Sequence, residues 1–522
     1  MIDIIKIPCE NDIKIICEDK NNIDAKVRVE LEGNKLNVWL TADKSFPKFV
    51  MLRWNQKIEK HVKIMGDTWE RGYANMCWKG ISPDSFMPWY FFADFGTETV
   101  GCGVMVRPNS FVSFQCDSRG VSAWFDVRCG TKGVQLGGRE ILIGTVVCKK
   151  YNNITPFEAA CDFCGVMCED PILPKEPVYG FNNWYYAYGN SSAEEVKTDA
   201  ALVAELCKDN INRPFMLIDD CWTPEKTIGP WVPNEKFRDM KKIAEDFKAM
   251  GVRPGLWVRL LNDPDFSNGH PEYLIHAEDE SLSRLDPSHP VVKEYIKEVV
   301  LRIKGWGYEL LKHDFSCNDI FATIGPYRNG MLTGLEPWTF YDRTKTSAEI
   351  VLDFYKLIRE TAGDMLVMGC NTISHLCAGL VEINRVGTDT SGKTWSRTRA
   401  VGVNTLAFRL PQNGKFYVID ADCVGIKDSY IPWKLNKQWT KLLAYSGSPL
   451  FVSCQPNVAT DEIKRDLKKY LAINSIQKDT IVPLDWQQNM VPDNWLINGE
   501  EVEFDWICEE YPILISSFSH PY

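Results

Sequence analysis

The 522-residue sequence has no apolar run near the roughly 20 residues that a membrane-spanning helix needs. It is also poor in positive charge, because 59 Lys and Arg residues stand against 70 Asp and Glu, a formal net charge of -11. Nucleic-acid binding relies on a basic surface that displaces counterions. We therefore expect neither a membrane protein nor a nucleic-acid partner.

An export signal is also missing. The first residues, MIDIIKIPCENDIKII, carry charges throughout and offer no small-residue cleavage site. Eighteen Cys residues without such a signal indicate reduced thiols in a cytoplasmic protein. Only Cys161, Cys164 and Cys168 cluster, and no second Cys or His pair lies nearby in the sequence. We expect these three to be small buried hydrophobic residues on one helix face rather than metal ligands.

Residues 1–150 predict an N-terminal β-sandwich. The stretch KVRVELEGNKLNVWLTA alternates apolar and polar residues around Glu32-Gly33-Asn34, as a β-hairpin does. Further short apolar runs, such as SFVSFQC and EILIGTVVC, are separated by Gly-rich breaks. Residues 151–176 predict a helical linker, and its Pro-rich end, PILPKEP, indicates a domain boundary.

Residues 177–454 predict an α/β fold, because apolar strands alternate there with amphipathic helices. The strand candidates are YGFNNWYY, FMLID, RPGLWVRL, YELLKHDF, LVMGC, INRVGTD, KFYVIDAD and PLFVSC. Eight β/α units over roughly 280 residues match a (β/α)8 TIM barrel. An open doubly wound sheet is the alternative, but no GxGxxG turn follows the first strand. Residues 455–522, one helical stretch and then short strands, predict a small C-terminal β-domain.

Polar residues gather where these strands end, which is where barrel enzymes place their chemistry. The residues at these ends are Asp219, Asp220, Trp257, Arg259, Lys312, Asp314, Cys370, Asn371, Arg385, Asp389, Asp420 and Asp422. Two opposed carboxylates across such a pocket are what glycoside hydrolysis requires. Lys312 and Asp314 project to the same side of one strand, so we expect the ammonium to keep that carboxylate ionised. Each residue alone has a simpler explanation, such as a helix cap or a loop ion pair, so the hypothesis depends on their sharing one face.

Four strings carry a family resemblance: LIDDCW (217–222), LLKHD (310–314), R-x-x-x-D (385–389) and D-A-D (420–422). In order and strand placement they resemble the α-galactosidases and α-N-acetylgalactosaminidases of glycoside hydrolase families 27 and 36. The segment GDTWERGYANMCW (66–78) resembles family 36 and its raffinose-synthase-like relatives. The resemblance implies a retaining barrel enzyme flanked by β-domains, with an oligosaccharide or glycoside substrate. We expect no metal or other cofactor, because two carboxylates and water suffice for this chemistry. It leaves a homo-oligomer possible.

The resemblance also assigns roles to individual residues. It makes Asp314 the nucleophile and Asp389 the general acid/base. Asp219 and Asp220 would hold the C4 and C6 hydroxyls of the sugar, Lys312 the neighbouring hydroxyls, and Arg385 the C2 region. We expect Arg385 to face the sugar and leave Asp389 free to take up a proton. The remaining substrate-side residues would be Trp184, Trp257, Cys370, Asn371 and Asp422.

The sequence departs from the family pattern near C2 of the sugar. GCNTISHL (369–376) replaces the C-x-G-G-G of family 36 and the C-E-W of family 27, and Arg259 stands where a neutral or acidic residue is expected. The sugar, galactose or N-acetylgalactosamine, stays open, as do linkage and aglycone. The leading prediction is a retaining α-galactosidase-like hydrolase. One alternative is an α-galactosyl transferase of the raffinose-synthase kind, and another is a catalytically silent carbohydrate-binding protein, which need not keep both catalytic carboxylates.

Overall fold

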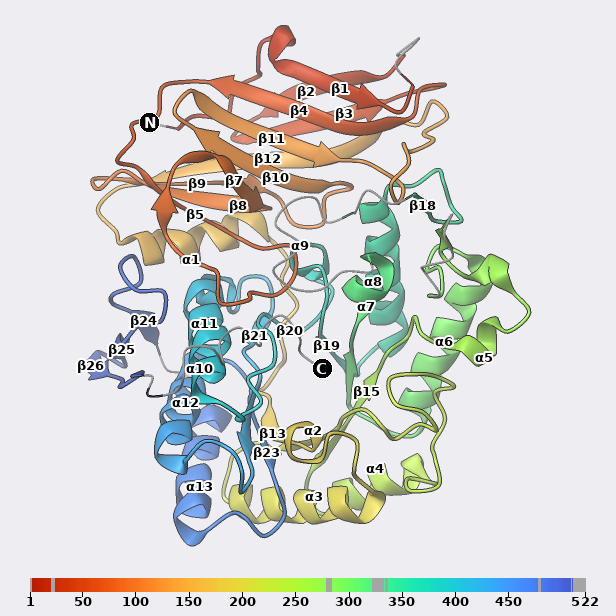
Figure 1. Cartoon of the computed structure of the whole chain (residues 1–522), viewed down its shortest axis with the longest axis vertical. Helices are drawn as coiled ribbons and strands as arrows, with labels where there is room; N and C mark the ends of the chain where they lie inside the picture. Colours follow the sequence, from red (N-terminus) through yellow and green to blue (C-terminus); the bar gives the residue numbers. More distant parts are fainter. Residues whose placement is uncertain are drawn as a thin grey trace.

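The computed structural model describes residues 2–19, 24–277, 284–321, 333, 337–476, 480–507 and 509. Its N-terminal antiparallel sheets lie across one end of a curled parallel sheet surrounded by helices, and a small antiparallel sheet lies at the side (Figure 1). The predicted fold class is thereby confirmed. Among the described helices, none combines the length and apolarity that crossing a bilayer requires.

The N-terminal region forms two antiparallel sheets. The first contains, in spatial order, β1 (Ile13–Cys17), β4 (Pro47–Asn55), β11 (Gly120–Asp126), β10 (Phe111–Asp117) and β7 (Ser82–Pro88). The second contains β2 (Lys26–Glu32), β3 (Lys35–Thr41), β12 (Ile141–Tyr151), β9 (Thr99–Val104), β8 (Tyr90–Asp94), β5 (Lys63–Gly66) and β6 (Lys79–Gly80). The predicted hairpin is β2–β3, and Gly33 takes the left-handed backbone conformation (φ 61°) that its turn requires.

The central sheet is parallel and closes on itself. Its spatial order is β21 (Val418–Asp420), β20 (Ile383–Arg385), β19 (Leu366–Gly369), β17 (Leu310–His313), β15 (Arg253–Val258), β14 (Phe215–Ile218), β13 (Tyr179–Asn182), β23 (Leu450–Cys454) and β22 (Cys423–Ile426). Only Ala421 and Asp422 separate the two edge strands, so one interrupted strand joins both edges. All the predicted barrel strands are present, and the seventh is the one that is broken.

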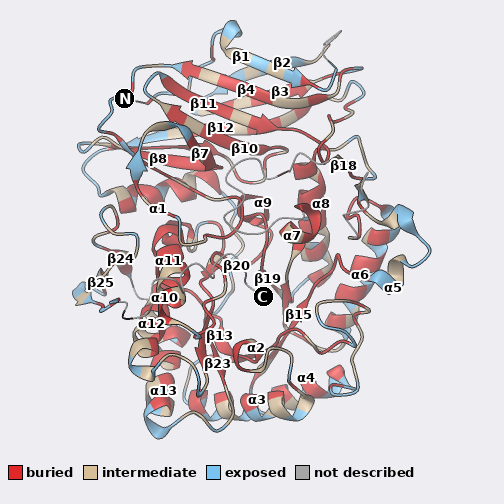
Figure 2. Ribbon diagram, in the orientation of Figure 1, coloured by how far each residue is buried: buried red, intermediate tan, exposed pale blue. Residues whose placement is uncertain are grey.

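Helices cover the outside of this barrel. The long ones are α3 (Ala193–Cys207), α4 (Met240–Ala249), α6 (Pro290–Gly305), α8 (Ser347–Ala362), α12 (Trp433–Ser446) and α13 (Asp461–Ile476). Each of them combines buried residues, most of which are apolar, with intermediate or exposed ones (Figure 2). Local signals set their starts: Ser192 accepts a hydrogen bond from the Glu195 N–H at the start of α3, and Pro290 opens α6.

Two connections bear on the domain boundaries. The linker helix α1 (Pro156–Met167) packs on β9 and β12 of the N-terminal sheets. Helix α13 packs on α3, α12 and β13, as the last helix of a barrel does, although it lies within residues 455–522. The antiparallel sheet of β24 (Ile481–Pro483), β25 (Asn494–Ile497) and β26 (Glu500–Glu503) follows it. We propose that the C-terminal β-domain begins after α13.

Residues 66–78, called the docking segment below, reach from the N-terminal sheets to the barrel. The Gly72 N–H donates to the Val386 carbonyl at 2.7 Å, just beyond the end of β20. A Cβ atom at Gly72 would lie 2.9 Å from Thr405 Oγ1, so only glycine allows this close approach. Asn404 in α11 (Asn404–Arg409) donates to the Met76 carbonyl at 2.8 Å. The docking segment therefore forms part of the barrel mouth.

Candidate active site

A pocket of about 450 Å³ opens at the C-terminal ends of the barrel strands. It contains ten of the predicted site residues: Trp184, Asp219, Asp220, Trp257, Lys312, Asp314, Cys370, Asn371, Arg385 and Asp389. Asp422 does not line the pocket but lies behind Arg385, whose Nη2 is 2.7 Å from its Oδ2. The shared face on which the sequence hypothesis depended is therefore present.

Asp219 and Asp220 follow β14 and are both buried. Asp219 Oδ2 accepts hydrogen bonds from Asn182 Nδ2 at 2.8 Å and from Lys312 Nζ at 2.7 Å. Asp220 Oδ1 accepts from the Cys221 and Thr227 backbone N–H groups, while its Oδ2 has no partner in the described structure. Burial raises the pKa of Asp220 to about 6. Its unpartnered oxygen is a ready acceptor for a ligand hydroxyl.

Lys312 pairs with Asp219 and not with its strand neighbour Asp314, which corrects the expectation from the sequence. The two partners lie on β17 and at the end of β14, with β15 between them, and alternate strands of a barrel place their side chains in one layer. Burial disfavours the charged ammonium, but Asp219 more than compensates and holds the pKa of Lys312 well above its usual value. Lys312 is therefore a fixed positive charge that lines the pocket.

Asp314, at the end of β17, is oriented by neutral donors. Trp257 Nε1 donates to its Oδ2 at 3.1 Å, and the Phe315 N–H donates to its Oδ1 at 2.7 Å. Its own N–H bonds the Val258 carbonyl, which ties the turn to β15. Phe315 has a φ of 62°, a left-handed conformation that costs energy in a bulky residue. Backbone and indole contacts thus aim this half-exposed carboxylate into the pocket.

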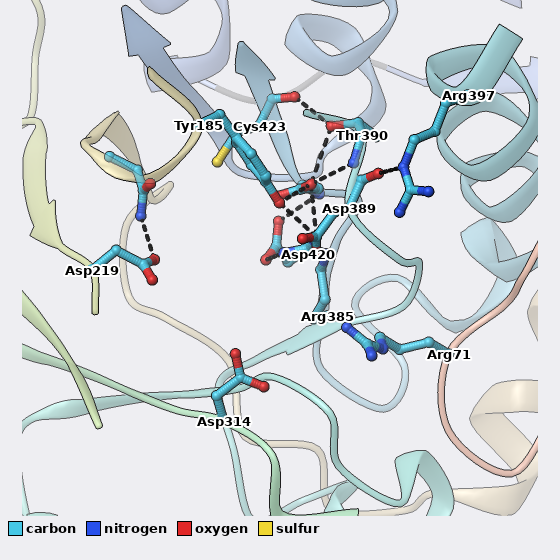
Figure 3. A network of polar contacts seen from close by, with 12 residues as sticks. Arg71, Tyr185, Asp219, Asp314, Arg385, Asp389, Thr390, Arg397, Asp420 and Cys423 are labelled. Carbon is cyan, nitrogen blue, oxygen red and sulfur yellow. Dashed lines mark hydrogen bonds and ion pairs between the residues drawn. The ribbon is translucent and has the colours of Figure 1, made fainter. Parts of the chain in front are cut away.

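Asp389 does not have the free carboxyl group that we expected. Arg385 Nη2 donates to its Oδ1 at 3.1 Å, and the same guanidinium contacts Asp422 and Tyr185 (Figure 3). Burial alone would raise the pKa of Asp389, but Arg385, assisted by Arg71 and Arg397, lowers it. Asp389 is therefore held ionised, and the expectation that Arg385 would leave it free is wrong.

Asp422 anchors Arg385 from behind. Its Oδ2 accepts hydrogen bonds from Tyr185 Oη at 2.6 Å and from the Thr390 N–H at 2.7 Å. Burial raises the pKa of Asp422, and Arg385 opposes that rise. Asp422 lies in the break between β21 and β22 with a φ of 79°. The interruption of the seventh strand is thus what turns this carboxylate toward Arg385.

Cys370 and Asn371 follow β19, and their surroundings include the docking segment. Asn371 Nδ2 donates to Glu70 Oε2 at 2.5 Å, and its Oδ1 accepts from the Asn318 N–H. Burial raises the pKa of the Cys370 thiol well above its usual value, so the thiol stays neutral. Asn371 is therefore held by the N-terminal region from one side and by α7 (Ser316–Phe321) from the other.

Arg259, whose role the sequence left open, lines the pocket and pairs with a buried carboxylate. Its Nη2 lies 2.5 Å from Asp319 Oδ1, and its guanidinium lies 4.2 Å from the centre of the Phe315 ring. Arg284 contacts the same carboxylate at 3.0 Å. Arg259 thus fixes α7 and the turn that carries Asp314.

Sequence reasoning missed several lining residues: Arg71, Tyr185, Lys226, Thr227, Phe315 and Asn318. Tyr185 and Phe315 directly follow predicted site residues, so their proximity was a usable signal. Arg71 comes from the docking segment, which the sequence analysis singled out only as a family-like string. Within the described residues, no three His, Cys, Asp or Glu side chains are grouped to hold a metal ion.

No protein-family model and no curated protein sequence matches the chain. Solved structures do match it. An α-galactosidase from Thermus thermophilus, in complex with p-nitrophenyl α-D-galactopyranoside, is 15% identical with a TM-score of 0.64, covering 94% of this chain and 98% of that one. A family 36 α-galactosidase variant from Geobacillus stearothermophilus, in complex with 1-deoxygalactonojirimycin, is 12% identical with a TM-score of 0.62. The match covers 94% of this chain and 74% of that one.

A more distant match is the family 31 dextranase of Flavobacterium johnsoniae, complexed with glucose. It is 11% identical with a TM-score of 0.55, covering 93% of this chain and 68% of that one. At such identities the likeness concerns the fold. Over most of its length, the chain has the fold of the glycoside hydrolase family 36 α-galactosidases.

Proposed function

We propose that the protein is a retaining α-glycosidase that acts on terminal α-linked galactose or a close analogue. The observation that carries the proposal is that Asp314 and Asp389 line one pocket at the catalytic end of a barrel. The structural relative that holds an α-galactopyranoside supports the choice of sugar.

In this proposal Asp314 attacks the anomeric carbon and forms a glycosyl ester. The Trp257 and Phe315 N–H groups that bond its two oxygens orient the carboxylate before the substrate arrives. Such preorganisation places the attacking atom without a further loss of entropy. The ester is then hydrolysed by water, so the product keeps the α configuration.

Asp389 would protonate the departing oxygen, which requires that it gain a proton first. The C2 hydroxyl of a bound sugar would compete for Arg385, while the 2.7 Å contact with Asp422 keeps the guanidinium in place. Weakening the Arg385–Asp389 contact, together with the nearby charge of Asp314, raises the pKa of Asp389. Once the ester forms, the charge of Asp314 is gone and Asp389 can act as the base.

The far side of the pocket would hold the sugar. Asp220 has an unpartnered carboxylate oxygen, and Asp219 and Lys312 form a fixed buried ion pair. Hydrogen bonds between sugar hydroxyls and such charged groups are stronger than those between neutral groups. We propose that these three residues bind the C4 and C6 hydroxyls and their neighbour.

The test is release of nitrophenol from p-nitrophenyl α-galactoside, with and without a sugar acceptor. We expect hydrolysis in both cases, and Asp314→Asn should lose several orders of magnitude in turnover because an amide cannot form the ester. The matched control is Asp246→Asn, at an Asp that pairs with Lys197 and Lys242 on the barrel surface. Transfer products without hydrolysis would indicate the transferase, and sugar binding without either product would indicate the silent binding protein.

A further inference from the structure

Among the residues that the structure describes, two positively charged side chains of the pocket have no counterion. The cationic side chains that line it are Arg71, Lys226, Arg259, Lys312 and Arg385. Three of these lie within 2.7 Å of a carboxylate, in the pairs Arg259–Asp319, Lys312–Asp219 and Arg385–Asp422. Neither Arg71 nor Lys226 has a carboxylate at ion-pair distance among the described residues.

Arg71 is the buried one of the two, with 8% of its surface exposed. Its Nε has no hydrogen-bond partner in the described structure, and its Nη2 makes one long bond of 3.5 Å, to Tyr73 Oη. The adjacent Glu70 is already engaged, because its oxygens accept from Tyr73 Oη at 2.6 Å and from Asn371 Nδ2 at 2.5 Å. A guanidinium offers five N–H donors, and because the Nε of Arg71 is fully buried, contact with a ligand in the pocket would come through the terminal nitrogens.

The charge of Arg71 is maintained in spite of this burial. Burial alone would lower the pKa of Arg71, but Tyr73, Glu70 and more distant groups that include Asp314 hold it well above the usual value. These groups favour the charged form, but none of the described carboxylates lies at ion-pair distance from the guanidinium, so an anionic ligand would be its direct counterion. The docking segment fixes the position of Arg71 through the bond between Gly72 and Val386.

The position of Arg71 identifies the part of the substrate that it faces. In Figure 3, Arg71 lies at the right next to Arg385, Asp219 lies at the left, and Asp314 lies between them. Arg71 also acts electrostatically on Asp389 and is itself influenced by Asp314. If Asp219 holds the remote hydroxyls, as the proposed function states, then Arg71 faces the anomeric end and the leaving group.

We propose that Arg71 binds an anionic group on the leaving group, so that the substrate is an α-glycoside with an acidic aglycone. A neutral hydroxyl offers one uncharged oxygen, whereas a carboxylate, sulfate or phosphate offers two charged oxygens to the guanidinium fork and forms the stronger contact. This inference rests on the proposed function and adds to it the chemical class of the aglycone.

Lys226 provides a matched control. It also lines the pocket, but its ammonium lies 5.0 Å from the centre of the Trp184 ring, and it acts on Asp220 at the sugar end. Removing either charge changes the net charge of the pocket equally. Only the removal of Arg71 should abolish a specific contact with the leaving group.

The test measures binding of three α-thiogalactosides that resist hydrolysis, with phenyl, 3-carboxyphenyl and 3-sulfophenyl groups, by titration calorimetry. We expect the intact protein to bind the acidic compounds at least tenfold more tightly than the phenyl compound. Arg71→Gln should remove the preference, Arg71→Lys should keep part of it, and Lys226→Gln should retain it. The relative affinities for the 3-carboxyphenyl and 3-sulfophenyl compounds show which anion the site favours.

Equal affinities in the intact protein, or no binding of any compound, would overturn the inference. So would a preference that survives in Arg71→Gln, once circular dichroism shows that this variant is folded, or one that Lys226→Gln loses to the same extent. The hydrolysis assay separates this failure from failure of the proposed function. Nitrophenol release with equal affinities refutes only the acidic aglycone, and a preference without nitrophenol release refutes only the hydrolase.

Discussion

Arg409 holds the docking segment on the barrel. The variant Arg409→Met should lower the free energy of unfolding by about 3–5 kcal/mol, because removing one partner of a buried ion pair leaves the other charge buried alone. Its Nη1 lies 2.8 Å from Asp67 Oδ1, in ion-pair contact without hydrogen-bond alignment, and both side chains are fully buried. The same Nη1 donates to Thr68 Oγ1 at 2.8 Å and to the Glu70 carbonyl at 3.2 Å. Arg409 thus anchors the residues that immediately precede Arg71.

The free energy of unfolding follows from urea denaturation monitored by tryptophan fluorescence. The double variant Asp67→Asn/Arg409→Met should recover most of the loss, because the penalty comes from a stranded buried carboxylate whose pKa burial already raises. As a control, Arg28→Met removes an exposed partner of Glu140 and should change the urea midpoint little. A loss below about 1 kcal/mol for Arg409→Met, or a double variant no more stable than the single one, would refute this reasoning.

Three further predictions concern the reaction. Asp389→Ala should lower kcat/KM about 10²–10⁴-fold for glycosides with poor leaving groups. The loss should be far smaller for activated phenyl glycosides, because phenolates depart without a proton. Equal losses in kcat/KM for both kinds of substrate would exclude Asp389 as the acid. The affinity for galactose should fall as the pH drops from 7 to 5, because the Asp220 carboxylate, with a pKa of about 6, is protonated over this range and becomes a weaker acceptor. Calorimetry on Asp220→Asn should show no such change. NMR should detect α-galactose as the first product, and β-galactose would indicate an inverting mechanism.

The barrel could be predicted because its strands carry their signal locally. FMLID and LLKHD are short apolar runs that end in polar residues, and the structure places Asp219, Lys312 and Asp314 at the pocket. Parallel order then brings the strand ends together without further information. This is why the predicted strands and most of the predicted pocket residues appear where the sequence placed them.

Partner choice within the pocket could not be predicted in the same way. Spacing along one strand suggested Asp314 as the neighbour of Lys312, but the layering of alternate strands gives it Asp219. Spacing within R-x-x-x-D likewise did not show that Asp422 and Asp389 share Arg385. Arg71 depends on the docking of two regions more than 300 residues apart, which no local pattern encodes.

The docking segment also has a consequence for biosynthesis. Thr68 and Arg409, which bond each other, are separated by 341 positions. At a translation rate of roughly 5–20 residues per second, the segment waits about 20–70 s for its partner to be made. During that interval Asp67, whose side chain is fully buried in the finished protein, lacks its ion-pair partner Arg409. A nascent chain that stops before α11 therefore lacks both Arg409 and the barrel strands β21, β22 and β23, so the residues that precede Arg71 are not yet held in place.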